Sequence, residues 1–211
     1  MNIIYRGDNM KPIIGVVARN NKEKYFISRE ILDAIRISGG IGIGIIPGSD
    51  YKKQLLLCDG IVLPGGNYID DFNRQIVRYS KDNNLPTLGI CLGMQTIGLE
   101  CNGQLSEHKI NQKTHNNKRV KSHEIIINKS SKLYGILDKE RIFVNSRHHD
   151  NIIDTDLDIV AKSVDGVIEA IEDAKKDFFI GVQWHPESIM HTDESKKLFK
   201  YFISCCKTKK V

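Results

Sequence analysis

One cysteine of this chain stands in a turn whose residues suit nucleophilic chemistry. Cys91 lies in Gly89-Ile90-Cys91-Leu92-Gly93, between an apolar run and an amphipathic one. A sharp strand-to-helix turn holds such a side chain above the sheet edge in a strained conformation. The helix N-terminus favours a thiolate, and the N–H of Leu92 would face an oxyanion. The pattern therefore predicts a nucleophile, although a buried structural cysteine in a tight turn would fit the same residues.

A candidate base and its orienting group follow another apolar run, in Gln183-Trp184-His185-Pro186-Glu187. A cysteine nucleophile needs an imidazole within hydrogen-bond reach and a third group that orients the ring. His185 and Glu187 are two residues apart, so in an extended chain they share a face. Pro186 between them restricts the backbone. We expect a Cys-His-Glu triad here; the alternative is a surface His-Pro-Glu turn.

The elements that must position these residues alternate along the first half of the chain. Apolar, β-rich runs are followed by amphipathic stretches with helical spacing. This order implies right-handed βαβ units, a parallel sheet with helices on both faces, and a site at the carboxyl ends of the strands. The expected strands are 12–18, 41–46, 60–63 and 86–90, and the expected helices are 24–38, 50–57, 70–83 and 92–101.

The second half of the chain reads as short strands separated by turns. Asp165-Gly166 between two such runs is a hairpin signal. The expected fold class is α/β: a doubly wound, mostly parallel sheet with helices on both faces and a small antiparallel extension. We expect one domain over 11–206, an N-terminal extension over 1–10 and a basic tail over 207–211. The expected strands are 123–127, 141–144, 159–164, 167–172 and 178–182, with a closing helix over 194–206.

Composition narrows the class of protein. The chain has 211 residues, which is enough for one α/β core. Its formal net charge is +5, and the only dense run of basic residues is the tail. No motif for nucleic-acid binding accompanies that run, so no nucleic-acid partner is expected. The five cysteines include no C-x-x-C pair, which favours a reduced, cytoplasmic protein. No run of about 18 apolar residues exists, so no membrane partner is expected.

Several motifs together resemble a known family. G-x-C-x-G-x-Q from Gly89 to Gln95, Leu63-Pro64-Gly65-Gly66, and Gln183 to Glu187 look like the class I glutamine amidotransferase-like superfamily, which has a flavodoxin-like fold. The resemblance covers nearly all of 11–206. Three further stretches resemble its γ-glutamyl-γ-aminobutyrate hydrolase branch: Lys11 to Val16, Ser122-His123-Glu124, and Val144-Asn145-Ser146-x-His148-His149.

The resemblance implies a role for each matching position. Cys91 would be the nucleophile, His185 the general base and acid, and Glu187 the orienting carboxylate. The backbone N–H groups of Gly66 and Leu92 would form the oxyanion hole.

Four more side chains are candidates for contact with substrate. Gln95, one helical turn after Cys91, would contact a γ-glutamyl group, unless it is a plain polar helix residue. Ser122, His123 and His148 either edge the pocket or belong to strand ends. No cofactor is expected. A metal site from His148, His149 and Asp150 is not expected either, because nothing supplies a matched ligand set elsewhere.

The expected function is hydrolysis of γ-glutamyl amides through a thioester, releasing glutamate and an amine. One alternative is a glutaminase subunit that delivers ammonia to a separate synthase. Another is a catalytically silent binding module on the same fold. The loop 67–70 lacks the longer acid-rich insertion common in the γ-glutamyl-γ-aminobutyrate hydrolases, so the leaving amine is not implied. Assembly into a homodimer is left open.

Overall fold

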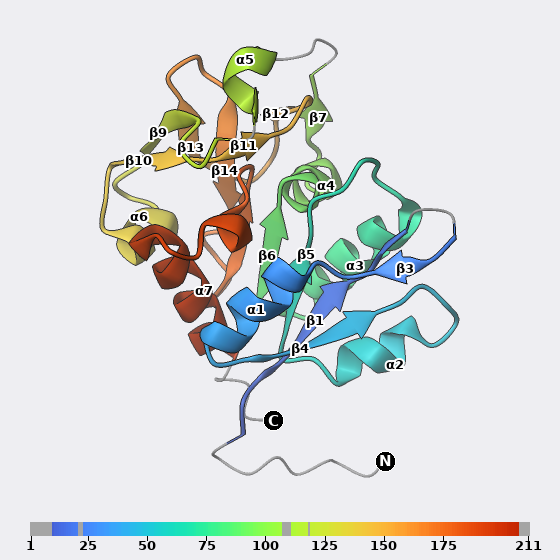
Figure 1. Ribbon diagram of the computed structural model, residues 1–211. Helices are drawn as coiled ribbons and strands as arrows, with labels where there is room; N and C mark the ends of the chain where they lie inside the picture. Colours follow the sequence, from blue (N-terminus) through green and yellow to red (C-terminus); the bar gives the residue numbers. More distant parts are fainter. Residues whose placement is uncertain (1–9, 21–22, 107–110, 118, 207–211) are drawn as a thin grey trace.

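The computed structural model describes residues 10–20, 23–106, 111–117 and 119–206. Within these residues a nine-stranded sheet forms the centre, in the order β10-β9-β13-β14-β15-β6-β5-β1-β4 (Figure 1). Five adjacent strands are parallel, as the alternating runs predict. These strands are β15 (Phe179–Val182), β6 (Thr87–Ile90), β5 (Gly60–Leu63), β1 (Ile13–Val17) and β4 (Ile41–Ile45).

The other four strands extend the sheet in antiparallel pairs beyond β15. The expected hairpin at Asp165-Gly166 joins two of them, and Gly166 has the positive φ of 86° that such a turn favours. The antiparallel strands are β14 (Ile168–Glu172), β13 (Asp158–Ser163), β9 (His123–Ile127) and β10 (Arg141–Val144).

Helices cover both faces of the sheet, which confirms the predicted fold class (Figure 1). One apolar core lies beneath α1 (Arg29–Ile37), α6 (Lys132–Leu137) and α7 (Asp193–Cys206). The second core lies beneath α2 (Tyr51–Leu56), α3 (Asp71–Asp82) and α4 (Leu92–Glu100). The two layers hold in place the strand ends at which the predicted site residues lie.

Short elements border the sheet at several places. β2 (Arg19–Asn20) and β3 (Tyr25–Phe26) pair antiparallel after β1. The others are β7 (Gln104–Leu105), α5 (Gln112–His115), β8 (Asn116–Asn117), β11 (Ser146–Arg147), β12 (Ile152–Asp154) and the 3-10 helix η1 (Pro186–Ile189).

The predicted helix over 24–38 is wrong at its start. Tyr25 and Phe26 pair as a strand, and Ser28 is extended, with φ −66° and ψ 129°, so the helix begins only at Arg29. The pairing with Arg19 and Asn20 outweighs the helical spacing. Residues 1–9 of the predicted N-terminal extension, and the tail 207–211, lie outside the described residues. No helix among the described residues is long and apolar enough to cross a membrane.

Candidate active site

Cys91 occupies the strained turn that its flanking glycines predict. Its backbone lies at φ 52° and ψ −105°, and it caps the N-terminus of α4 directly after β6. Its N–H donates to the carbonyl oxygen of Val182 at 2.8 Å, at the end of neighbouring strand β15. A non-glycine residue at positive φ costs of the order of 1–3 kcal/mol and persists only where its surroundings enforce it. The turn thus projects the thiol at the carboxyl edge of the sheet.

The two glycines beside Cys91 allow the strand and the helix to approach closely. A Cβ on Gly93 would lie 2.1 Å from the carbonyl oxygen of Leu63 in β5. A Cβ on Gly89 would lie 2.8 Å from the carbonyl carbon of Gly93. Backbone atoms cannot yield to a side chain at such distances, so α4 can pack this tightly only without these two Cβ atoms.

His185 and Glu187 meet through a tight turn rather than along an extended strand. His185 Nδ1 lies 2.8 Å from Glu187 Oε1. His185 caps η1, and Glu187 lies in its first turn, so the expected contact forms by a different local geometry. Both side chains are buried. The carboxylate fixes the Nδ1–H tautomer, which leaves Nε2 for the thiol.

The protonated form of His185 is favoured in this site. Burial by itself would lower the pKa, but hydrogen bonds with Cys91 and Glu187 and the charges of those groups outweigh burial and raise the pKa of His185 to about 9. A protonated imidazole in this place can donate a proton to a leaving group.

Asn145, which follows β10, holds the backbone of His185 at two points. Its Nδ2 donates to the carbonyl oxygen of His185 at 3.0 Å, and its Oδ1 accepts from the N–H of His185 at 2.9 Å. The sequence motifs predict no site role for Asn145. Its place in Val144-Asn145-Ser146 is the only signal for it in the sequence.

The backbone of Gly65 lies beside both Cys91 and His185. A Cβ at Gly65 would lie 2.8 Å from His185 Cε1 and 3.2 Å from Cys91 Cβ, so both side chains border this backbone. Gly66 and Leu92, the two predicted oxyanion-hole residues, line one pocket of about 100 Å³ beside it. The first N–H groups of a helix have no partner within the helix, so Leu92 can offer its N–H to this pocket.

Arg19 adds a cation to the same pocket, and it is a residue that the sequence motifs do not predict. Arg19 lies in β2, two residues after the end of β1, and its side chain lines the pocket. Burial lowers the pKa of the guanidinium, while Glu187 and Cys91 act in the opposite direction. Its buried Nε has no hydrogen-bond partner among the described residues. Its position past a parallel strand's carboxyl end is the available signal.

Gln95 is directed away from this pocket. Its Nε2 donates to the carbonyl oxygen of Asp150 at 2.9 Å and to Gln183 Oε1 at 3.2 Å. The side chain is buried and is not among the described residues that line the pocket. Its amide group therefore ties α4 to the loop after β11.

The predicted pocket-edge residues lie together elsewhere. His123 and His148 surround the buried carboxylate of Glu169, and Ser122 Oγ accepts from Asn117 Nδ2 at 2.6 Å. None of the three is among the described residues that line the pocket with Arg19. The candidate site therefore comprises the triad, Gly65, Gly66, Leu92 and Arg19, with Asn145 as support.

Comparison with known proteins places this architecture in a family. The family described as peptidase C26 matches residues 69–187, more than half of the chain. A glutamine amidotransferase-like protein from Rickettsia prowazekii (strain Madrid E) is 31% identical over 93% of this chain and 98% of its own length. The chain belongs to the peptidase C26 family. This membership confirms the resemblance drawn from the motifs.

Other relatives and structural neighbours are named for different activities. A γ-glutamyl-γ-aminobutyrate hydrolase from Escherichia coli (strain K12) is 27% identical over 93% of its length and 92% of this chain. A GMP synthase subunit from Thermoplasma acidophilum superposes with a TM-score of 0.73 at 24% identity, over 94% of this chain and 95% of its own. That likeness concerns the fold alone. Peptidase C26 membership supports a cysteine-type enzyme that acts on amide bonds.

Proposed function

We propose that this peptidase C26 protein hydrolyses γ-glutamyl amides with Cys91 as nucleophile, releasing glutamate and an amine. The observation that carries the proposal is the thiol–imidazole–carboxylate series at the ends of two neighbouring strands. Hydrogen-bonded groups in this order activate a thiol for acyl transfer.

The reaction needs two steps and no cofactor. The Cys91 thiolate attacks the δ-carbonyl carbon, and the N–H groups of Gly66 and Leu92 stabilise the oxyanion. His185 gives its proton to the amine as the C–N bond breaks, leaving a γ-glutamyl thioester. Water then gives a proton to His185 and attacks the thioester, the C–S bond breaks, and glutamate leaves. An oxyanion-hole donor typically contributes about 3 kcal/mol in the transition state.

Arg19 supports recognition of the glutamyl part of the substrate. A γ-glutamyl group carries an α-carboxylate, which suits a half-buried guanidinium whose Nε has no hydrogen-bond partner within the described part of the chain. Arg19 lines the pocket together with Gly65, Gly66 and Leu92. We therefore assign Arg19 to the α-carboxylate and the oxyanion hole to the δ-carbonyl.

A second candidate function uses the same chemistry on glutamine. The solved structure of the GMP synthase subunit has this fold, and the relative from Rickettsia prowazekii is named as a glutamine amidotransferase-like protein. In that case a separate synthase would receive the ammonia. Steady turnover by the isolated chain supports the standalone hydrolase, and activity that appears only with a partner supports the glutaminase.

The test is a hydrolysis screen of the purified chain against glutamine, γ-glutamyl-γ-aminobutyrate and several γ-glutamyl peptides. Cys91→Ala and Cys91→Ser should abolish release of glutamate, whereas the matched control Cys205→Ser, in α7, should not. Undiminished turnover by Cys91→Ala would overturn the assignment of the nucleophile. A folded wild-type chain that neither turns over these substrates nor forms an acyl-enzyme would favour the silent binding module.

A further inference from the structure

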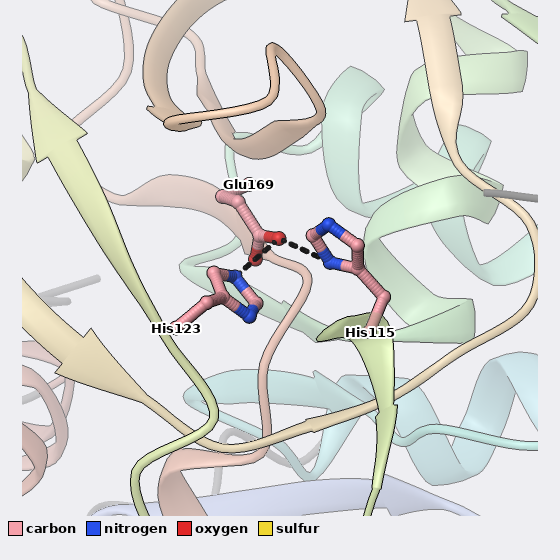
Figure 2. A group of neighbouring side chains, drawn as sticks. All are labelled: His115, His123 and Glu169. Atoms are coloured by element: carbon pink, nitrogen blue, oxygen red, sulfur yellow. Dashed lines mark hydrogen bonds and ion pairs between the residues drawn. The ribbon is translucent and has the colours of Figure 1, made fainter. Parts of the chain in front are cut away.

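A second group of buried titratable side chains lies outside the triad. His115, His123, His148 and Glu169 are 0%, 8%, 3% and 0% exposed. They come from α5, β9, the segment after β11, and β14, and Figure 2 shows His115 and His123 directed toward the Glu169 carboxylate. Three imidazoles and one carboxylate converge here from four separate stretches of chain.

The imidazole nitrogens converge on one oxygen atom. Glu169 Oε1 lies 2.9 Å from His123 Nε2, 3.4 Å from His115 Nδ1 and 3.8 Å from His148 Nε2. A carboxylate oxygen therefore lies at the centre of the three rings.

Other acceptors fix the proton positions on two of these rings. His115 Nε2 lies 3.1 Å from both carboxylate oxygens of Asp165, and His148 Nδ1 donates to the carbonyl oxygen of Asp150 at 3.0 Å. A neutral imidazole with one nitrogen protonated has a lone pair on the other. When both rings are neutral, His115 Nδ1 and His148 Nε2 each keep a lone pair directed at the Glu169 carboxylate, where a bound cation would accept it.

Several of these atoms also lack hydrogen bonds. Among the described residues, His115 Nδ1, His148 Nε2 and Glu169 Oε2 are buried and have no hydrogen-bond partner. A buried polar atom without a partner costs about 1–3 kcal/mol. Unpartnered buried groups that point to one spot are therefore expected to have a ligand there.

We propose that His115 Nδ1, His123 Nε2 and Glu169, whose ligand atoms all lie within 4.8 Å of one another, bind a divalent transition-metal ion, preferably Zn²⁺, with His148 Nε2 as a further ligand from beside Glu169 Oε1. Zn²⁺ takes imidazole and carboxylate ligands at about 2.0–2.2 Å in a tetrahedron, which sets ligand atoms about 3.3 Å apart. The three separations around Glu169 Oε1 bracket that spacing.

The surroundings of the cluster match those of a metal site. Metal-bound histidines usually donate their other N–H to a carboxylate or a backbone carbonyl, as His115 does to Asp165 and His148 does to Asp150. A pocket of about 340 Å³, lined in part by Thr114, His123 and Asp165, gives an ion a path to the cluster.

The metal would join α5, β9, β14 and the loop after β11. The Asp150 carbonyl that accepts from His148 also accepts from Gln95 on the helix that follows Cys91. The ion would thus anchor a loop that braces the nucleophile's helix. As a metal ligand, the sequence offers His148 together with its neighbours His149 and Asp150, a set from which no metal site is expected. His149 is exposed, and the companions of His148 in the cluster include His115 and Glu169, which lie 33 and 21 residues away along the chain.

The test uses the full chain with Cys91→Ser, so that the active-site thiol cannot bind the probe metal and activity is not the readout. After chelation and dialysis, we expect this chain to take up one equivalent of Zn²⁺ or Co²⁺. The Co²⁺ form should show the intense visible absorption of a tetrahedral site. His148→Ala and Glu169→Gln should each weaken binding by at least about 100-fold. His149→Ala, which changes the exposed neighbour, should bind like its parent.

The outcomes separate the metal site from the proposed hydrolase. Failure of the Cys91→Ser chain to bind Zn²⁺ or Co²⁺ overturns the site. Equal loss from His149→Ala and His148→Ala, or full binding by Glu169→Gln, does the same. Should a variant unfold, the test rests on the folded Cys91→Ser chain: intense visible absorption with Co²⁺ supports a tetrahedral site, and its absence contradicts one. A missing hydrolytic activity in the wild-type chain changes none of these results.

Discussion

Asn145 and His185 form a reciprocal pair in which one side-chain amide satisfies both backbone groups of the other residue, at 3.0 Å and 2.9 Å. The two residues are 40 positions apart and both are buried. With Glu187 on Nδ1 and Asn145 on the backbone, the imidazole has little freedom to turn away from Cys91.

Asn145→Ala should therefore impair catalysis more than substrate binding. Each lost hydrogen bond leaves a buried backbone group unpaired, at a cost of about 1–3 kcal/mol. We expect kcat to fall about 10- to 100-fold with KM nearly unchanged, because Asn145 does not line the substrate pocket. Steady-state kinetics measure kcat and KM separately. Asn145→Asp keeps the acceptor for the His185 N–H, so its kcat should lie between those of the wild-type chain and Asn145→Ala. A rise in KM alone would contradict a positioning role.

Gly65→Ala should strongly reduce activity in a chain that still folds. The new methyl group would lie 2.8 Å from His185 Cε1 and 3.2 Å from Cys91 Cβ, so the base and the thiol must separate. We expect kcat/KM to fall at least about 100-fold.

The matched control is Gly135→Ala in α6, where a Cβ meets nothing within 4 Å. This change should raise the free energy of unfolding by about 0.5–1 kcal/mol and leave turnover unaltered. Circular dichroism and denaturant unfolding separate the two effects. An active Gly65→Ala chain would show that the thiol and imidazole need not share this space.

The rate should decline on the alkaline side as His185 loses its proton. Its pKa of about 9 lies above the ordinary 6.5, so the imidazolium that protonates the leaving amine persists to that pH. We expect kcat/KM to fall as the pH rises through about 9. Glu187→Gln removes a charge that favours the imidazolium, so its alkaline limb should lie at lower pH.

The same shift has a consequence for folding. Because the pKa of His185 is raised in the folded chain, its contribution to stability is complete below pH 6.5 and is lost as the pH rises through about 9. Kinetics and unfolding measured from about pH 6 to about pH 10 check both effects. An alkaline limb that is the same in the wild-type chain and in Glu187→Gln would show that His185 does not set it.

Arg19→Gln should weaken binding of substrates with an α-carboxylate. Loss of a charged hydrogen bond costs about 1.5–3 kcal/mol, so we expect KM to rise about 10- to 100-fold. Arg29→Gln, on the exposed surface of α1, is the matched control and should change nothing. For an amide substrate without the α-carboxylate, the wild-type chain and Arg19→Gln should have the same KM. Equal losses on both substrates would place Arg19 outside recognition of the α-carboxylate.

Glu172→Ala should destabilise the fold without touching the site. Its carboxylate accepts from the N–H groups of Lys132 and Leu133 at 2.8 Å and 3.1 Å and so caps α6 from a neighbouring strand. We expect the free energy of unfolding to fall by about 2 kcal/mol, with kcat and KM unchanged in the folded fraction. Urea titration measures the loss, and Glu172→Gln, which keeps an acceptor, should lose less.

The parallel half of the sheet was predictable because each of its strands is a continuous apolar run followed by a helical pattern. Cys91 was predictable for a related reason, since the strained turn needs Gly89 and Gly93 beside it in sequence. The start of α1 was missed because Tyr25 and Phe26 pair locally with Asn20 and Arg19, and this short antiparallel pairing competes with the helical spacing of 24–38. A different limit applies to His115 and Glu169, which are 54 residues apart and meet only in the folded chain.

The bond from the Cys91 N–H to the Val182 carbonyl oxygen extends the ladder of β6 and β15 by one step past the strands. The spacing between sulfur and imidazole is thus a property of the central sheet, whereas Arg19 and residues 67–70 belong to its surface connections. Surface connections accept insertions and deletions far more readily than a buried ladder does. If the proposed function holds, a change in the length of these connections should alter which leaving amine is accepted, without moving the thiol relative to the imidazole.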